Sequence, residues 1–497
     1  MISLILLPVL IPFATFILLL FFRRAVAINQ FFAILGALVQ LVVSLLILFR
    51  VSDQGILVTQ LGNWPAPYGI TVVADLFSAI MLVMSGLIGL SISIYSVSGL
   101  NKNYHKGSFY PLMSVLLMGV NGAFLTGDVF NLYVWFEVLI IASFALLTLG
   151  GSKAQMYGGL KYMTINLISS MIFLAAIGLL YGKTGTLNIA DLALRMRETE
   201  SSGMIATTGM LFFIAFGIKA ALFPFFFWLP ASYHTPPVTI TALFSGLMTK
   251  VGIYAMIRFF TMIFVQDQQL WQHLLLTIGG LTMVIGVLTA ASQYDIRRIL
   301  SFHIISQIGY MVVGLGLFTV SGVAGAIYFL AHNIITKTNT FLVAGIVNHI
   351  KGSFDLKAIG GLYRSHPFIA LFMFIPMAGL AGVPPLSGFF GKLLLIIAGF
   401  EAHQWLITGV AVLVSLFTMF SMIKIWNEGF WKKQPVTAAV NNKEKVPYTM
   451  LLPVIVLALL TIILGVAAEP FINLSTRAAD QLINPAEYIQ AVLRRSS

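Results

Sequence analysis

Six ionisable side chains stand inside long apolar stretches of this sequence. They are Glu137, Lys219, Lys250, His332, Lys337 and Lys392. A charged group at membrane depth costs on the order of a few kcal/mol, so such groups are usually retained for a function. Carboxyl, amine and imidazole groups exchange protons, and neighbouring charges in a low dielectric affect one another strongly. The residue types and their order therefore predict a relay that carries ions across a membrane.

Each of these residues also has a structural interpretation. A lysine near the end of a span can extend its amine to the interface, and Glu137 can be held neutral by packing or pair with a cation. His332 and His303 could ligate a haem, but no second matched pair of histidines accompanies them. His303 is either a relay group or a histidine close to a basic loop. Asp75 is predicted to be an interfacial residue at a helix start.

Prolines interrupt the apolar stretches close to two of the lysines, Lys219 and Lys392. The predicted helix-breaking residues are Pro224, Pro230, Pro384 and Pro385. Proline removes a backbone donor, which is tolerated at membrane depth only where protein or a water-filled cavity satisfies the freed groups. Interrupted helices at corresponding places in two halves of a chain are typical of a transport site.

The composition places these residues in a membrane protein. The chain has 497 residues, of which 59% are hydrophobic and 9% are charged, whereas soluble domains carry roughly a quarter charged residues. Its net charge of +12 is spread over short loops between apolar stretches, which argues against a nucleic-acid partner. The absence of cysteine excludes disulfides, thiolate metal sites and iron–sulfur ligation within this chain. We expect no cofactor and no metal, and a transporter subunit with no enzyme activity of its own.

The apolar stretches predict an all-α polytopic membrane protein with about 14 spans of about 20 residues each. The predicted spans are 2–22, 27–49, 72–98, 109–126, 129–150, 158–182, 204–228, 238–264, 270–292, 299–319, 322–347, 367–398, 404–427 and 447–468. Spans four to eight and nine to thirteen form two sets of five. Because five is odd, the two sets have opposite orientations in the membrane, which is an inverted repeat with helices 7 and 12 interrupted.

These spans divide the chain into four parts. Residues 1–108 hold three helices and an extracytoplasmic hairpin within 51–71. The other parts are the first repeat at 109–264, the second repeat at 265–427, and a final helix with an amphipathic tail at 428–497. Within the first repeat, the helical spacing of apolar residues over 186–200 predicts an amphipathic segment on the membrane surface.

Basic residues gather in the loops after odd-numbered spans. They are Arg23 and Arg24; Lys102 and Lys106; Lys153; Arg297 and Arg298; Lys351, Lys357 and Arg364; and Lys432, Lys433, Lys443 and Lys445. The other loops are poor in Lys and Arg apart from Lys183, Arg195 and Arg197. Cytoplasmic loops carry an excess of Lys and Arg, so the odd loops are predicted to face the cytoplasm and both termini to lie outside it.

The stretch from Lys219 to Arg258 carries a family resemblance. It contains Lys-Ala-Ala-Leu-Phe-Pro, Trp-Leu-Pro-Ala-Ser-Tyr-His-Thr-Pro-Pro and Lys-Val-Gly-Ile-Tyr. This pattern resembles the signature around the seventh and eighth helices of the proton-translocating, antiporter-like subunits shared by respiratory complex I and Mrp-type cation/proton antiporters. The resemblance covers almost the whole chain and is strongest over 129–260 and 295–395.

The resemblance implies roles for individual residues. The family's helix-five glutamate falls on Glu137, its helix-seven lysine on Lys219, its helix-eight lysine on Lys250 and its helix-twelve lysine on Lys392. The family often shows His-x-x-x-Lys in helix eleven, whereas this sequence has one residue more between His332 and Lys337. Which of these two residues faces the ion path is therefore left open.

Both ends of the chain resemble the Mrp branch, and within it the D-type subunits, in Leu-Leu-Pro-Val-Leu-Ile-Pro and Asn484-Pro-Ala-Glu-Tyr-Ile-Gln-Ala-Val-Leu. The resemblance implies a hetero-oligomeric Mrp complex in the bacterial plasma membrane that exchanges sodium for protons, with this chain supplying the proton route. The partners implied are the other subunits, H+, Na+ and the lipid bilayer. The alternative is a proton-pumping subunit of a complex I-like NADH dehydrogenase or a membrane-bound hydrogenase.

Overall fold

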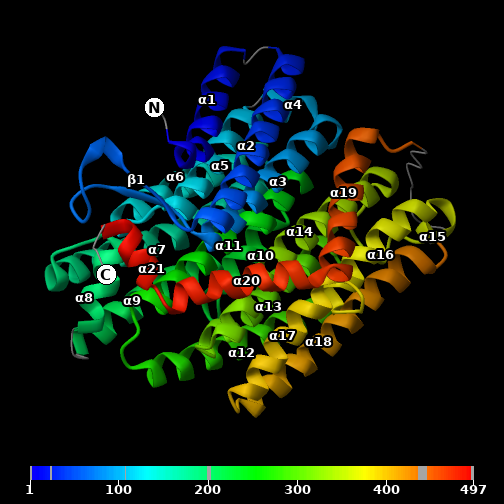
Figure 1. The fold of residues 1–497 in the computed structure, drawn as a ribbon. Helices are drawn as coiled ribbons and strands as arrows, with labels where there is room; N and C mark the ends of the chain where they lie inside the picture. Colours follow the sequence, from blue (N-terminus) through cyan, green and yellow to red (C-terminus); the bar gives the residue numbers. More distant parts are fainter. Residues whose placement is uncertain (1–2, 23–24, 107, 199–202, 435–444, 494–497) are drawn as a thin grey trace.

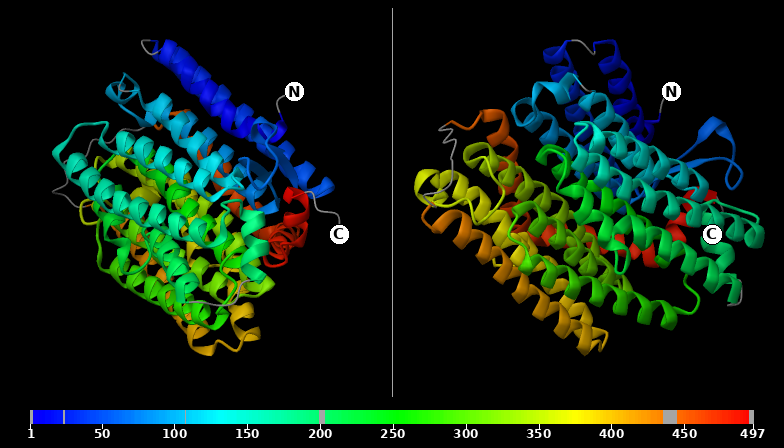
Figure 2. Two further views of the ribbon diagram at one scale, coloured as in Figure 1. Left: turned by 90° about the vertical axis from the view of Figure 1, so that its left-hand side faces the viewer. Right: turned by 180° about the vertical axis from the view of Figure 1, so that it is seen from behind.

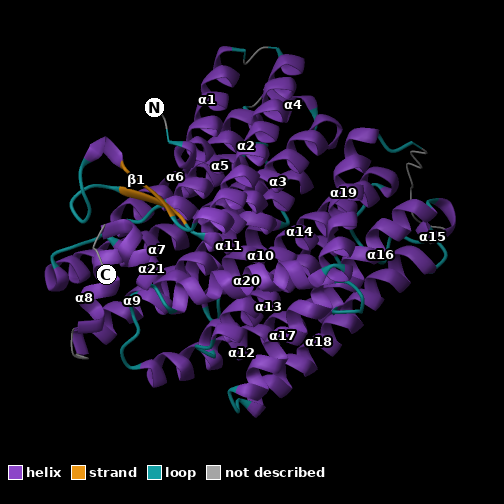
Figure 3. Ribbon diagram, viewed as in Figure 1, coloured by secondary structure: helices purple, strands orange, loops and turns teal. Residues whose placement is uncertain are grey.

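A computed structural model describes residues 3–22, 25–106, 108–198, 203–434 and 445–493 of the chain. Arg23, Arg24 and Lys443, which contributed to the predicted topology, lie outside these ranges, as do residues 199–200 of the predicted amphipathic segment. Within them, almost all regular structure is helical, with one small pair of strands (Figure 3).

The elements follow one another in the order shown in Figure 1. The first half holds α1 Leu7–Phe21, α2 Val26–Gln54, β1 Leu57–Gln60, β2 Thr71–Ala74, α3 Leu76–Gly99, α4 Lys102–Lys106, α5 Phe109–Leu125, α6 Val129–Thr148, α7 Lys153–Thr184, α8 Ile189–Glu198, α9 Gly203–Ala220, α10 Trp228–Tyr233 and α11 Val238–Met262. The second half holds α12 Gln268–Ser292, α13 Ile296–Gly316, α14 Val320–Lys351, α15 Leu362–Ser365, α16 Pro367–Ala381, α17 Ser387–Glu401, α18 Trp405–Ile425, α19 Tyr448–Val466, α20 Ala468–Ile483 and α21 Ala486–Leu493. Short 3₁₀ turns lie at η1 Leu4–Leu6, η2 Leu61–Asn63 and η3 Phe225–Phe227, and a π turn, η4 Trp426–Trp431, follows α18.

Helix occupies each of the predicted spans, which confirms the polytopic all-α class. In the described part of the chain, 11 helices are long and apolar enough to cross a membrane. The helix α14 is 32 residues long but is not one of them, and its side chains are buried along most of its length. Because α14 also carries many polar residues, it belongs to the interior of the bundle.

The connection after α2 forms the predicted hairpin. Strands β1 and β2 pair antiparallel, with Leu57 opposite Ala74 and Gln60 opposite Thr71. The predicted amphipathic segment forms α8, whose inner face is buried, so this helix packs on the protein along one side. Figure 1 shows the hairpin, α8 and both chain ends toward the left of the bundle, whereas α4 and α15 lie toward the right. Two of the segments that follow even-numbered spans, the hairpin and α8, thus lie on the same side of the bundle as the chain ends.

Helices 7 and 12 are both interrupted, as predicted. The first break separates α9 from α10, and the second separates α16 from α17. Each break begins with a residue in the left-handed backbone region, Ala221 at φ 61° and Gly382 at φ 88°. In each case a cis proline peptide follows, at Pro224 and Pro385. The same succession of backbone conformations therefore ends both helices.

A pair of matched backbone bridges supports the internal repeat. In the first half, the Val129 N–H donates to the Leu187 carbonyl at 2.9 Å, next to the bridge between Asp128 and Asn188. In the second half, the Ile296 N–H donates to the Phe354 carbonyl at 3.0 Å, next to the bridge between Asp295 and Asp355. The two donor–acceptor pairs have the same separation along the chain. The starts of α6 and α13, the fifth and tenth predicted spans, are thus hydrogen-bonded in the same way. Each bonds to the loop that follows the next transmembrane helix.

The C-terminal helices cover one face of this bundle. Figure 1 and Figure 2 show α20 lying across the transmembrane helices, and α20 packs against α14, α3 and α11. Its buried positions are mostly alanine, serine and leucine on one side, so the amphipathic tail predicted from the sequence is seated on protein along that side. The boundaries at residues 108, 264 and 427 stay predictions from the sequence.

Candidate functional site

The break in helix 7 places Lys219 at the end of α9. The backbone groups freed by the break find partners: the Trp228 indole donates to the Ile218 carbonyl at 3.0 Å, and the Phe223 N–H donates to the Thr282 hydroxyl at 3.1 Å. Pro230, one of the predicted breaking residues, lies in the first turn of α10. Proline is tolerated there because those N–H groups have no intrahelical partner. Pro224 is therefore the proline that lies in the interruption.

The Lys219 ammonium is buried, with only 7% of the residue exposed. It donates to the Ser170 hydroxyl at 3.4 Å and lies 5.0 Å from the centre of the Phe136 ring. Beside it is a cavity of about 20 Å³, which Asn166 and Tyr162 also line. A space of this size with polar walls can hold one water molecule. Lys219 thus has weak direct compensation for its charge and room for water.

Glu137 lies on α6, one residue after Phe136 and partly exposed. Among the described residues, no Lys, Arg or His nitrogen lies within 4.0 Å of its carboxylate. One carboxylate oxygen, Oε1, is buried without a hydrogen-bond partner, although Glu137 is close enough to Lys219 to act on its charge. Glu137 therefore acts on the charge of Lys219 through space, without a direct ion pair between the two side chains.

Lys250 and Lys337 continue this row into the centre of the bundle. Both residues are fully buried, on α11 and α14. The Lys250 ammonium donates to the Ser245 carbonyl of its own helix. The Lys337 ammonium has no hydrogen-bond partner among the described residues, and it lies within electrostatic reach of Lys250 and Lys392. The described structure thus brings together lysines from both halves.

Further polar side chains lie buried on α13 and α14 without partners in the described part of the chain. Asn333 and Asn339 on α14 and Gln307 on α13 each leave both amide atoms unsatisfied in the described structure. Buried polar groups almost always find a protein or water partner. Buried amides without a protein partner therefore indicate ordered water along α13 and α14.

His332 reaches from α14 to the second interruption. Its Nδ1 lies 2.7 Å from the hydroxyl of Ser387, the first residue of α17, and 3.2 Å from the Thr336 hydroxyl. Its Nε2 is buried without a partner. Both residues left open by the sequence are thus buried, and they differ in their neighbours. His332 contacts the break, whereas the Lys337 ammonium has no hydrogen-bond partner among the described residues.

Lys392 lies on α17 and turns back across the break in helix 12. Its ammonium donates to the Leu380 carbonyl at 2.9 Å, to the Ala381 carbonyl at 3.1 Å and to the Ser415 hydroxyl at 3.0 Å. These carbonyls are left unpaired because α16 ends there, and the partial negative charge of a helix C-terminus stabilises a cation. The interruption at Pro384 and Pro385 thus leaves carbonyl oxygens that accept hydrogen bonds from the Lys392 ammonium.

His303 is fully buried in α13, two turns after the helix starts at the basic loop. Its Nε2 lies 2.9 Å from the Ser421 hydroxyl on α18, and its Nδ1 has no partner. The described residues show no group of three or more His, Asp or Glu side chains arranged to hold a metal ion. The haem alternative finds no support in this arrangement, because His303 and His332 each bond to a serine.

The sequence analysis missed an ion pair. Asp75 is the N-cap of α3, as predicted, but it is buried and not interfacial. Its carboxylate lies 2.8 and 2.9 Å from the Arg258 guanidinium, which also contacts the Tyr254 hydroxyl. Arg258 within an apolar helix was the signal that could have led to its partner.

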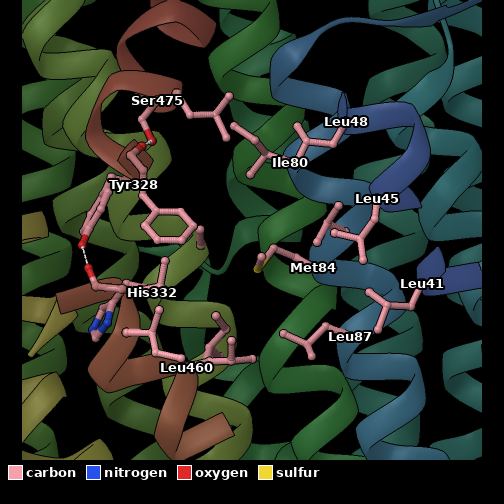
Figure 4. Close-up of a pocket in the computed structure, with 17 residues that line it drawn as sticks. Leu41, Leu45, Leu48, Ile80, Met84, Leu87, Tyr328, His332, Leu460 and Ser475 are labelled. Atoms are coloured by element: carbon pink, nitrogen blue, oxygen red, sulfur yellow. Dashed lines mark hydrogen bonds between the residues drawn. The ribbon is translucent and has the colours of Figure 1, made fainter. Parts of the chain in front are cut away.

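His332 also borders an apolar pocket of about 340 Å³ (Figure 4). The pocket lies between α2, α3, α14, α19 and α20, and its walls are mostly leucine and isoleucine. In Figure 4 the His332 ring points away from this space, and the Tyr328 hydroxyl donates to the Leu464 carbonyl at its edge. Because the pocket offers few polar groups, it is not part of the ion path.

Comparisons with known proteins agree with this geometry. Residues 126–418 match the family described as NADH:quinone oxidoreductase/Mrp antiporter, TM. A D-type Na(+)/H(+) antiporter subunit of Alkalihalophilus pseudofirmus is 46% identical over 492 residues, and the alignment covers 99% of each chain. The D-type Na(+)/H(+) antiporter subunit of Bacillus subtilis is 37% identical over 493 residues, again covering 99% of each chain.

Solved structures give the same result. A chain in the Mrp complex from Dietzia sp. DQ12-45-1b is similar with a TM-score of 0.90 and 31% identity, covering 99% of both chains. A chain of an archaeal membrane-bound sulfane sulfur reductase has a TM-score of 0.90 at 24% identity, over 98% of this chain and 99% of that one, which shows a shared fold alone. The resemblance found in the residues, including the likeness to the D-type subunits, is confirmed. With its buried lysines and paired interruptions, this multi-pass membrane chain belongs to the NADH:quinone oxidoreductase/Mrp antiporter family.

Proposed function

We propose that this chain is the D-type, proton-translocating subunit of a multisubunit Na+/H+ antiporter. The observation that carries the proposal is the row of buried lysines, drawn from both halves of the chain and joined by unsatisfied polar groups on α13 and α14. The named relatives are D-type Na(+)/H(+) antiporter subunits, and a similar solved chain is part of an Mrp complex. The partners are therefore the other subunits of such a complex, with H+ and Na+ as the exchanged ions.

In this proposal a proton passes between Lys219 and Lys392 through the middle of the bundle. Protonation of Lys219 responds to the carboxylate of Glu137, since opposite charges in a low dielectric attract strongly. Lys250 and Lys337 then carry the charge toward the second break, with the water expected around the unsatisfied amides as the connection. Because like charges repel, a proton on one lysine disfavours a proton on the next, and this couples the sites. His332 lies beside this route at the second break.

We place the complex in the bacterial plasma membrane, with both termini outside the cytoplasm. The distribution of Lys and Arg among the loops supports this orientation. The chain would act as a secondary transporter subunit, and any redox chemistry would belong to other proteins. A role in a redox complex is supported by the shared fold with the sulfane sulfur reductase chain and by a family description that also covers NADH:quinone oxidoreductase. The relatives named as antiporter subunits match along the whole chain and favour the antiporter.

Ion exchange in membrane vesicles tests the proposal. The variants Glu137→Ala and Lys219→Ala are incorporated into the assembled complex, and pH changes driven by added Na+ are measured per complex. Both variants should lose most of the Na+-driven signal, because one removes the charge acting on the carrier and the other removes the carrier itself. Lys153→Ala, an exposed lysine at the start of α7, is the matched control and should retain the signal. Full exchange by the Lys219 variant would overturn the proposal.

A further inference from the structure

A groove of about 580 Å³ lies outside the row of buried lysines, where the two halves meet. One wall is the start of α7, and its floor is the interrupted part of helix 7, η3 with α10. The opposite wall comes from the end of α12 and the start of α13. Gly158 permits the close approach of α7 to α10, since a Cβ there would lie 3.1 Å from the Ala231 carbonyl oxygen. The groove is thus a feature of how the halves pack.

Two cations on opposite walls line this groove, Lys161 and Arg298. Both side chains are exposed, and neither has a carboxylate within 4.0 Å among the described residues. The Lys161 ammonium lies 4.3 Å from the centre of the Tyr157 ring. Asp295 bonds the backbone N–H of Arg298 and pairs with Arg297 at 3.8 Å, so its charge is already engaged. The groove therefore carries a net positive charge.

His234 contributes hydrogen bonding to the groove but no positive charge near neutral pH. Its Nδ1 lies 2.6 Å from the Pro230 carbonyl oxygen, which can only accept, so Nδ1 carries the proton and Nε2 is left as an acceptor. Burial lowers the pKa of His234; the Pro230 carbonyl raises it, while Arg298 and Arg297 lower it again. The charge in the groove thus comes from Lys161 and Arg298.

The rim of the groove is aromatic and exposed. Tyr157 is 63% exposed and Phe227 is 55% exposed, and Leu160 beside them on α7 is 59% exposed. On a membrane-spanning helix such side chains face the bilayer, and aromatic residues favour the level of the lipid headgroups. Basic pockets between transmembrane helices on the cytoplasmic side are suited to anionic lipid headgroups. The loops near this groove carry Lys153 and Arg297, which the charge distribution assigns to the cytoplasmic side.

We propose that this groove binds the phosphate headgroup of an anionic phospholipid from the cytoplasmic leaflet. Lys161 and Arg298 would contact the phosphate oxygens from opposite walls, and the acyl chains would lie along Tyr157 and Phe227. A phosphate held between these two walls ties α7 of the first half to α13 of the second. It also rests on α10, so the bound lipid would brace the interrupted helix that follows Lys219.

Lipid binding by the intact complex tests this proposal. The complex that contains this chain is purified in detergent and titrated with phosphatidylglycerol or phosphatidylcholine, and bound lipid is counted by native mass spectrometry. In Lys161→Gln/Arg298→Gln the tightest phosphatidylglycerol binding should weaken by about 25-fold, because each cation beside an anionic headgroup contributes about fivefold. The control Lys153→Gln and the charge-preserving Lys161→Arg/Arg298→Lys should bind like the wild type.

A second variant covers the case in which the glutamine pair does not assemble. Ala154→Trp fills the groove from its exposed wall without changing a charge, and it should also weaken phosphatidylglycerol binding. Unchanged binding in either variant would overturn the proposal and indicate that a partner subunit covers the groove. Equal retention of phosphatidylcholine, or displacement of phosphatidylglycerol by an equal concentration of inorganic phosphate, would also overturn it. Because the readout is bound lipid, this outcome is distinguishable from a failure of ion exchange.

Discussion

The four lysines of the proposed row, Lys219, Lys250, Lys337 and Lys392, differ in how their charges are compensated. Lys392 donates to two free helix carbonyls and a hydroxyl, whereas Lys219 and Lys250 each donate to one oxygen. Lys337 has no partner among the described residues. A buried ammonium without acceptors is the least stable arrangement for a positive charge. We therefore propose that a proton stays only briefly on Lys337 and stays longer on Lys392, where its charge is better compensated.

The buried pair of Asp75 and Arg258 predicts a large loss of stability when one partner is removed. In Arg258→Gln the Asp75 carboxylate remains buried and unpaired, so we expect a loss of about 3–5 kcal/mol. The double variant Asp75→Asn/Arg258→Gln should recover part of this loss, since asparagine keeps the N-cap and no buried charge remains. Thermal unfolding of the purified complex measures both. A single variant as stable as the wild type would contradict the assigned pair.

The same pair predicts a pH dependence. Because only the ionised Asp75 carboxylate pairs with Arg258, the stability that this pair provides is present while the carboxyl is ionised and is lost when acid protonates it. The difference in unfolding midpoint between wild type and Asp75→Asn should therefore be constant from about pH 5 to 7 and shrink below about pH 4. A difference that does not change with pH would argue against a charged Asp75.

At this scale the sequence predicts which residues are buried charges but not which of them meet. Lysines inside apolar stretches are visible in the sequence because their desolvation needs an explanation. Asp75 and Arg258 are 183 positions apart, on α3 and α11, and nothing in their local sequence indicates a contact. The same holds for His303 and Ser421, which only the packing of α13 against α18 brings together.

At the scale of elements, the two interruptions place their lysines differently. The first leaves Lys219 at the end of α9, before the break, with a water-sized cavity beside it. The second places Lys392 after the break, where it folds back onto the carbonyl end of α16. Lysine precedes proline at the first break and follows it at the second, and the two orders place the ammonium differently at a broken helix.

The backbone at the second break predicts the effect of a small substitution. Gly382 has a φ of 88°, and a Cβ there would lie 3.1 Å from the Lys392 Cδ. Gly382→Ala should therefore cost about 1–2 kcal/mol in the left-handed conformation and shift the lysine, which lowers exchange per complex. Gly409→Ala on α18, where a Cβ meets nothing within 4 Å, is the matched control. Equal exchange in the two variants would show that the position of Lys392 does not depend on the turn.

Elements were predicted well because their signals are local. Apolar length identified the spans, and Pro224 and Pro385 identified the breaks. Pro230 lies in the first turn of α10, just after the interruption, and proline in a first turn looks the same in the sequence as proline in a helix interior. The sequence also did not predict the burial of Asp75. The helices that cover this residue are α20 and α21, near the other end of the chain, and Gln481 of α20 accepts a hydrogen bond from the Leu76 N–H.

At the scale of the whole molecule, the chain joins two similar halves through α13 and α14. The matched bridges at Val129 and Ile296 show how each half begins, and the sequence indicated the repeat only through its two breaks. The arrangement of the two halves depends on packing among many helices. The hydrophobic periodicity of the sequence carries no information about that packing. The interior amides of α14 explain why it is less apolar than its neighbours.

The family membership predicts the composition of the assembly. A tagged form of this chain, purified from its native membrane in mild detergent, should bring along the other subunits of a multisubunit antiporter. It should contain no flavin or iron–sulfur subunit in stoichiometric amount. Mass spectrometry of the purified complex, with iron and flavin determined on the same sample, measures this. Stoichiometric redox subunits would favour the respiratory alternative.

Exchange by variants of two buried lysines, one from each half of the chain, tests the central claim most directly. Lys250→Gln and Lys392→Gln are assembled into the complex, and Na+-driven pH changes in vesicles are normalised to the amount of complex, with Lys153→Gln as control. If the buried lysines form one proton path, both variants should lose exchange by about tenfold or more per complex, since each gap in the row adds a desolvation barrier of at least ~1.4 kcal/mol. Variants that lower the yield of complex but exchange normally per complex would contradict the account and make these lysines structural.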